Sequence, residues 1–475
     1  MADPRPDAFP ARLALNAWDG GTDSVVAEVA PSSFAFARRE LELDRRRFLA
    51  PDELADAWDW RDARVGWGVI LPDVDQAKVS LVDQARAADR PELGPLLAAR
   101  GDAPVFRYRK NHPATHLQRV LPDGSVRDID IAGSPRGNAR DALPMFLTIV
   151  AEPKDIPWGF QGLLSTRAAV GRLPLTGPEL ASYVDAMLND WHEAPTPQRE
   201  VVVWAVDFGK ADITRLMLRA IADPLVAKYG KDNDIRLTHL DGSTETLDGE
   251  AATFIAAVTS QKPRLIVTTS HGATAPVDKP AQMQLTLGMP VDQRRRALVL
   301  ADLLAGWEPD GVIWYAHACC GAGSSDLSDY VDLVQGDERV VSLLRGVSAI
   351  GESVAPLPMA LLTAPKPARG FIGHVEPTFD WTIGSPLTGQ HLTAALVNGL
   401  YDVLFQTQPM PLGFAMQEWY DGAATALGIW DEARKTLNKT GTATEDLLRS
   451  LLVARDRTGQ VILGDPTVVL GPVHA

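Results

Sequence analysis

The sequence predicts an α/β protein built on a mostly parallel sheet flanked by helices. Two observations predict this fold. From about residue 145 onward, short apolar runs rich in β-branched residues alternate with amphipathic segments. Two of these runs, at residues 265–269 and 312–315, lead into a reactive side chain beside glycine. The chain has 475 residues, more than one hydrophobic core of usual size holds, so we expect two or three domains or subdomains.

Residues 1–140 are predicted to form an N-terminal accessory α+β domain. This part is rich in Pro, Asp and Arg and has few long apolar runs. Residues 117–121 and 126–131 flank the sequence Pro-Asp-Gly-Ser, which is typical of a β-hairpin. The highly charged stretch at 38–47 is expected to be a solvated face or strand edge rather than a partner-binding site.

The rest of the chain is predicted to hold two subdomains, at residues 141–197 and 198–475. Buried strands are expected at residues 145–150, 201–206, 235–240, 265–269, 312–315 and 369–375. Helices are expected at residues 177–191, 213–226, 249–258 and 291–304, and over most of 391–452. Because helices separate most of these strands, the pattern favours parallel neighbours.

A histidine and a cysteine follow two of the predicted strands. His271 comes just after 265–269, and Cys319 comes just after 312–315. Ligands of open α/β sheets bind beyond the carboxyl ends of the strands, where these two side chains can meet. An imidazole next to a thiol lowers its pKa and can protonate a leaving amine, which is the basis of thiolate catalysis. Either motif alone is more often an ordinary turn or a buried strand end.

Composition and charge narrow the class of partner. The chain has 46 basic and 61 acidic residues and a net charge of −15, which argues against nucleic acid or an anionic membrane as the main partner. Its two cysteines are adjacent, so we expect no disulfide framework and a reducing compartment. We find no signal-peptide core, membrane-spanning run or His-Glu-x-x-His motif, and we expect a cytoplasmic protein with no metal and no cofactor.

Several segments resemble the gingipain-type cysteine peptidases, which group with caspases, separases and CHAT-domain proteases in the caspase-haemoglobinase fold. The segments are 147–157, 169–173, His271-Gly272, Ala318-Cys319, 373–378 and 464–467. Forty-eight residues separate His271 from Cys319, close to the spacing of about 50 that is typical of caspases, whose pentapeptide signature residues 317–321 match in part. The resemblance covers roughly residues 143–471 and implies two subdomains, the second carrying the dyad.

The resemblance also implies roles for individual residues. Cys319 is the expected nucleophile, His271 the expected general acid/base, and the backbone N–H groups of Gly272 and Cys319 the expected oxyanion hole. Such peptidases often place an acidic residue behind the histidine at an earlier strand end, and Asp207 is the candidate, although capping of the next helix is an equal alternative. Cys320 is expected to be a small buried residue.

Substrate preference is expected to lie in the loops at 321–330 and 376–386. Asp326, Asp329 and Asp380 place carboxylates where a substrate Arg or Lys could pair with them. Each carboxylate taken alone is more often a solvated loop residue. Trp381 is expected to be either a wall of the cleft or a packed core aromatic. The loops therefore predict a basic residue before the scissile bond.

These features predict a cytoplasmic cysteine endopeptidase that cleaves a protein or peptide substrate. By analogy with intracellular caspase-like proteins, we expect an activating protein partner and a role in a bacterial regulatory or defence pathway. Gingipain-type enzymes are usually exported, so the lack of a signal argues against an extracellular digestive role. The alternative is a catalytically inactive peptidase-fold protein that binds peptides or acts as a scaffold.

Overall fold

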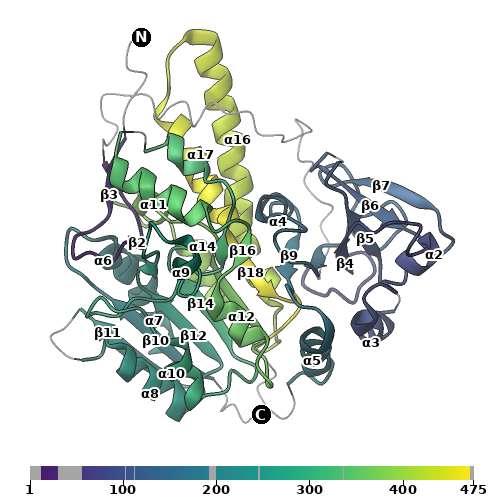
Figure 1. Ribbon diagram of the computed structural model, residues 1–475, viewed down its shortest axis with the longest axis horizontal. Helices are drawn as coiled ribbons and strands as arrows, with labels where there is room; N and C mark the ends of the chain where they lie inside the picture. The colour runs from purple at the N-terminus through teal and green to yellow at the C-terminus, as the bar shows by residue number, and fades with distance from the viewer. Residues whose placement is uncertain are drawn as a thin grey trace.

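The computed structural model describes residues 12–29, 56–101, 103–111, 113–191, 199–243, 247–334 and 336–470. The fold is α/β, with a twelve-stranded mixed sheet flanked by helices (Figure 1). The charged stretch at 38–47 lies outside the described residues. None of the helices in the described ranges is both long and apolar enough to cross a membrane.

Five parallel strands form the first block of the sheet. In spatial order they are β11 (Arg236–Gly242), β10 (Glu200–Val206), β12 (Leu265–Thr269), β14 (Ile313–His317) and β17 (Gly370–His374). Every residue of the last four is buried. Runs of apolar, β-branched residues suit strands that are covered on both faces, which is why the sequence predicted these strands correctly.

The second block runs in the opposite direction. It contains β18 (Gln460–Gly464), β9 (Ala169–Arg172), β8 (Phe146–Ile149), β4 (Trp67–Pro72) and β5 (Val105–Tyr108), followed by the antiparallel β6 (His116–Val120) and β7 (Val126–Asp130). The blocks meet where β17 and β18 pair antiparallel. The predicted hairpin is β6–β7. Because β4 pairs with β8, one sheet continues across the predicted domain boundary at residue 140.

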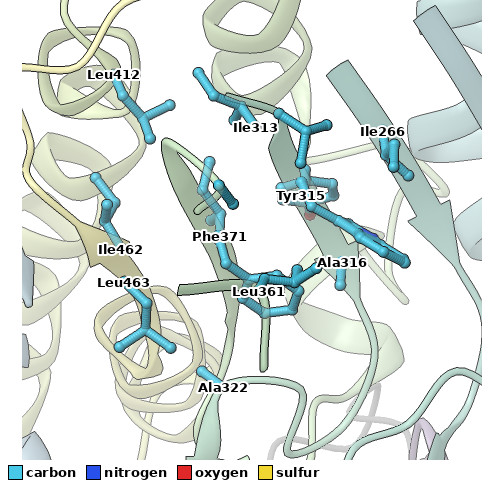
Figure 2. Close-up of a cluster of buried hydrophobic side chains, with 14 of the residues drawn as sticks. Ile266, Ile313, Tyr315, Ala316, Ala322, Leu361, Phe371, Leu412, Ile462 and Leu463 are labelled. Carbon is cyan, nitrogen blue, oxygen red and sulfur yellow. The ribbon is translucent and has the colours of Figure 1, made fainter. Parts of the chain in front are cut away.

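A hydrophobic core joins the two blocks. Figure 2 shows Ile313 and Phe371 of the first block near Ile462 and Leu463 of β18. Leu361 from the neighbouring helix belongs to the same cluster. Each fully buried side chain of this size contributes roughly 1.5–3 kcal/mol to folding. The core therefore fixes β14, and with it the position where the chain leaves the sheet toward Cys319.

Helices connect and cover the strands. They are α2 (Leu81–Gln84), α3 (Gly94–Ala99), α4 (Trp158–Ser165), α5 (Gly177–Leu188), α6 (Ile213–Met217), α7 (Asp223–Tyr229), α8 (Ala251–Gln261), α9 (Pro280–Met283), α10 (Leu300–Ala305), α11 (Glu338–Ser348), α12 (Pro356–Leu362), α13 (Asp380–Ile383), α14 (Ala394–Asn398), α15 (Leu412–Ala415), α16 (Gln417–Thr440) and α17 (Glu445–Gly459). The predicted helix at 213–226 is continuous through a π-helical turn between α6 and α7.

The helix predicted at 291–304 is wrong over its first nine residues. The Asp292 carboxylate accepts hydrogen bonds from the backbone N–H groups of Arg294 and Arg296, and Val291 pairs with Ala297. Such side-chain-to-backbone bonds compete with the helical pattern and form a tight turn instead. The turn is part of the site, because the N–H of Val291 donates to the carbonyl of His271 at 3.0 Å.

The first described residues lie far from the strands that follow them in the chain. Strands β1 (Arg12–Ala14) and β3 (Val26–Glu28) pair with each other, and β2 (Ala17–Trp18) pairs with β13 (Gly272–Ala273). Figure 1 shows β2 and β3 on the left beside α6, and β4 to β7 on the right. The predicted accessory region therefore splits, and residues 12–28, here called the N-terminal segment, lie against the candidate site.

Candidate active site

The two reactive residues follow neighbouring strands. β12 and β14 pair in parallel with Thr269 opposite His317, and His271 and Cys319 each lie two residues further on. The backbones touch at this point, because a Cβ atom added to Gly272 would overlap the carbonyl group of Cys319. The tertiary structure thus brings together the two strand ends that the sequence singled out.

The close approach at Gly272 gives a first prediction. Alanine at this position would press against the main chain of Cys319, which cannot move aside as a flexible side chain would. We expect Gly272→Ala to lower the free energy of unfolding by about 1–3 kcal/mol, the usual cost of overpacking. Urea unfolding measures this. A matched control is Gly428→Ala on α16, where an added Cβ atom meets nothing within 4 Å. Equal stability of the two variants would contradict the contact.

Both ring nitrogens of His271 face oxygen atoms. Nε2 lies 3.1 Å from each carboxylate oxygen of Asp212, and Nδ1 lies 2.9 Å from Oδ1 of Asn16. Phe208 stacks on the ring at a centroid distance of 5.4 Å. The histidine is 1% exposed. It is therefore held by contacts on both edges and one face.

These contacts select one protonation state of the imidazole. The Asn16 amide nitrogen donates to the carbonyl of His317, so its oxygen must accept from Nδ1 of His271. Nε2 faces a carboxylate and must donate as well. Both ring nitrogens of His271 are then engaged, Nδ1 by Asn16 and Nε2 by Asp212. Between the described side chains of His271 and Cys319 there is no hydrogen bond, and the imidazole has no nitrogen left to receive the thiol proton.

Asp212 is the acidic partner of His271. It precedes α6 as its N-cap and accepts from the backbone N–H of Thr214 at 2.9 Å. Ser24 of the N-terminal segment donates its hydroxyl to the same carboxylate at 2.6 Å. Burial raises the pKa of Asp212. The hydrogen bond and charge of His271, together with the hydroxyl donors Ser24 and Thr214, lower it by more than burial raises it. The pKa of Asp212 therefore lies well below its usual value.

The expectation that Asp207 stands behind the histidine is wrong. Asp207 follows β10 directly, and its carboxylate pairs with Arg215 at 2.7 Å and accepts from the N–H of Gly209. Strand-end position favoured Asp207, but the loop turns its carboxylate toward α6. The alternative that Asp207 caps the next helix is also wrong, because the cap of α6 is Asp212, and it is this cap that reaches His271.

The thiol of Cys319 is buried and protonated. Its sulfur accepts from the backbone N–H of Thr378 at 3.4 Å. Burial raises the pKa of Cys319 well above its usual value, and burial does the same for Cys320, as expected for a small core residue. Within the described residues, no hydrogen bond uses the N–H of Cys319, which leaves this group for an oxyanion. Gly272, the other expected donor, lies in β13 and pairs with β2.

A cavity of about 260 Å³ opens beside the loop that carries the thiol. Its walls come from α4, the end of α17 and both loops that were expected to set specificity, with Asp329 and Glu376 among its lining. Neither Cys319 nor His271 lines this cavity, and the connection runs through the neighbouring residue, because the N–H of Cys320 donates to the carbonyl of Glu376 at 3.3 Å. Burial raises the pKa of Glu376 to about 8, against a hydrogen bond from Ser328 that lowers it.

The other expected substrate residues lie elsewhere. Asp329 lines the cavity but pairs with Arg455 at 2.9 Å, and Asp326 is exposed outside the lining. Asp380 accepts from the N–H of Ala14, and burial raises its pKa to about 6. Trp381 is 2% exposed within a core cluster, so it packs in the core and is not a cleft wall.

No family of proteins is found to match this chain by sequence, and no curated protein matches it. Among solved structures, the Saccharomyces cerevisiae separase-securin complex is similar with a TM-score of 0.28 and 9% sequence identity. The match covers 72% of this chain and 16% of that chain. Similarity at this level carries no argument, so the interpretation of the site rests on its own geometry. In the described part of the chain, no group of three His, Cys, Asp or Glu side chains is placed to hold a metal ion.

Three residues of the site were missed from the sequence. Asp212 directly precedes the helix predicted at 213–226, and Glu376 is the first residue of the loop predicted at 376–386. Asn16 carried no signal at all, since 255 residues separate it from His271. Contacts over such a separation leave no periodic pattern in the sequence.

Proposed function

We propose that the protein is a cysteine endopeptidase in which Cys319 is the nucleophile, His271 carries the proton and Asp212 fixes the imidazole. The observation that carries the proposal is the contact between the backbones of Gly272 and Cys319 at the ends of two parallel strands, with a buried carboxylate behind the histidine. The gingipain-like and caspase-like identity, a cytoplasmic setting, an activating partner and a role in bacterial defence rest on the sequence resemblance alone.

The chemistry requires one rearrangement. His271 must give up its contact with Asn16 and lose the Nδ1 proton to solvent, after which the thiol proton passes to Nδ1 and leaves a thiolate. The thiolate then adds to the substrate carbonyl, with the N–H of Cys319 as a donor to the oxyanion. As the C–N bond breaks, the imidazolium gives its proton to the leaving amine, and water later hydrolyses the thioester. Asp212 stabilises the imidazolium throughout.

A basic residue before the scissile bond fits the acidic cavity. Arg455 already pairs with Asp329, so Glu376 is the lining carboxyl group that a substrate cation would meet. Above about pH 8, where the carboxyl group is ionised, we expect Glu376→Gln to lower kcat/KM for substrates with Arg or Lys at that position by roughly 10- to 100-fold, the loss of one hydrogen bond to a charged group. The exposed Asp326 gives the matched control Asp326→Asn, for which we expect no change.

The same carboxyl group sets a pH dependence. The pKa of Glu376 is about 8, so only above this pH is the free enzyme mostly in the anionic form that attracts a cation. For basic substrates kcat/KM should therefore rise through about pH 8, and Glu376→Gln should remove that rise. An unchanged profile in the variant would exclude Glu376 from the subsite.

A second function is favoured by the state of the dyad. Both nitrogens of His271 are engaged, Cys319 is fully buried, and the thiol is protonated. These features fit a catalytically inactive peptidase-fold protein that binds peptides or serves as a scaffold. Such a protein would keep the fold and the cavity without turnover.

Hydrolysis of a fluorogenic peptide library distinguishes the two functions. The library is varied at the residue before the scissile bond and assayed with the full chain. Turnover that disappears in His271→Ala supports the peptidase. Binding of library peptides without turnover, both by the intact protein and by an Asn16→Ala variant in which His271 loses one oxygen partner, supports the scaffold.

A further inference from the structure

One side chain of the N-terminal segment contacts His271 and also the end of the strand from which Cys319 follows. Asn16 is fully buried, and its Oδ1 lies 2.9 Å from Nδ1 of His271. Its Nδ2 donates to the carbonyl of His317, the last residue of β14, at 3.3 Å. The amide group therefore bridges the imidazole and the strand end from which Cys319 follows.

The backbone of Asn16 reaches the thiol through a second path. Its N–H donates to the carbonyl of Thr378 at 3.0 Å, and the N–H of Thr378 in turn donates to the sulfur of Cys319 at 3.4 Å. Asn16 thus fixes the position of Thr378, whose N–H bonds to the thiol sulfur. Asn16 therefore holds His271 directly and Cys319 through Thr378. In neither contact do the imidazole and the thiol bond to each other, as catalysis requires.

We propose that Asn16 is a positioning residue that keeps the dyad latent, and that the enzyme becomes active when the N-terminal segment releases it. This inference rests on the proposed peptidase function. While the amide oxygen accepts from Nδ1, that nitrogen cannot receive the thiol proton. Loss of this contact, together with loss of the Nδ1 proton to solvent, leaves Nδ1 able to accept the thiol proton.

The way the segment is attached is consistent with release. The pairing of β2 with β13 spans two residues, and that of β1 with β3 spans three. A further anchor is an ion pair at the surface, where Asp19 lies 2.6 Å from Arg339 of α11. Short pairings and a solvent-facing ion pair open at lower free energy than the central strands do. The apolar contacts of Leu13 and Leu15 hold the segment in its closed position.

The test measures alkylation of Cys319 by iodoacetamide at pH 7 in a Cys320→Ala background, so that one thiol remains. We expect Asn16→Ala and the milder Asn16→Ser to raise the rate about tenfold or more, because a thiol pKa lowered by one unit gives about ten times as much thiolate. Asn16→Asp keeps an oxygen acceptor on Nδ1, and we expect no acceleration.

Two controls separate activation from simple exposure. Ser24→Ala removes a contact of the same segment with Asp212 but leaves Asn16 in place, and it should not accelerate alkylation. Adding His271→Ala to Asn16→Ala should return the rate to that of the parent. Acceleration that persists without the histidine means that the thiol was only uncovered, and this result overturns the proposal.

The experiments test the inhibitory role of Asn16, here called the latch, separately from the peptidase function. If Asn16→Ser keeps the parent melting temperature and alkylates no faster, the latch is wrong, whether or not the parent cleaves peptides. If alkylation accelerates in a His271-dependent way while no library peptide is cleaved by any variant, the latch holds and the peptidase function is wrong.

Discussion

Replacing Cys319 by alanine is expected to abolish peptide hydrolysis, with kcat falling roughly 10³-fold or more, as for other covalent nucleophiles. Cys319 is the cysteine whose main chain touches Gly272 next to the histidine. The measurement is turnover of the best fluorogenic peptide by the purified full chain, with Asn16→Ser in both proteins compared so that the dyad is released.

The adjacent cysteine supplies the control for this prediction. Cys320 is also buried, and its backbone has a positive φ of 55°, so it occupies the turn after the nucleophile. Alanine tolerates that conformation about as well as cysteine does, and we expect Cys320→Ala to retain activity. Loss of turnover in Cys320→Ala with activity in Cys319→Ala would reverse the assignment of the nucleophile.

The second large effect is expected at Asp212. In Asp212→Asn the amide oxygen can still cap α6, but the negative charge that pairs with His271 is removed. We expect kcat to fall roughly 10⁴-fold, as when the carboxylate of a Ser-His-Asp triad becomes an amide. Loss of a hydrogen bond between charged groups should also lower the free energy of unfolding by about 1.5–3 kcal/mol. Asp207→Asn breaks only the pair with Arg215 and should leave kcat nearly unchanged.

The same carboxylate should govern acid stability. The folded state holds the pKa of Asp212 below its value of about 3.9 in the unfolded chain. Its contribution is therefore complete above about pH 4 and is lost as the pH falls toward the folded pKa. Melting temperatures measured between pH 5 and pH 2 should fall more steeply for the parent than for Asp212→Asn. Parallel curves would show that this pair does not stabilise the fold.

Local features of the sequence determined the strands and the places where they end. The runs before His271 and Cys319 are apolar and β-branched, and such residues favour buried strands wherever the chain places them. The spacing of these runs, with helical segments between them, indicated parallel neighbours. The same local reasoning failed at 291–299, where one aspartate makes a turn through its own side chain.

The tertiary structure alone decided the state of the site. The partners of His271 are Asp212, which lies at a helix cap, and Asn16, which lies 255 residues away in a segment that composition had assigned to an accessory domain. The sheet also reverses direction between β17 and β18, which no strand pattern reveals. Local propensity acts between near neighbours in the chain, whereas the protonation and partners of a buried imidazole depend on whichever distant groups the packed fold brings to it.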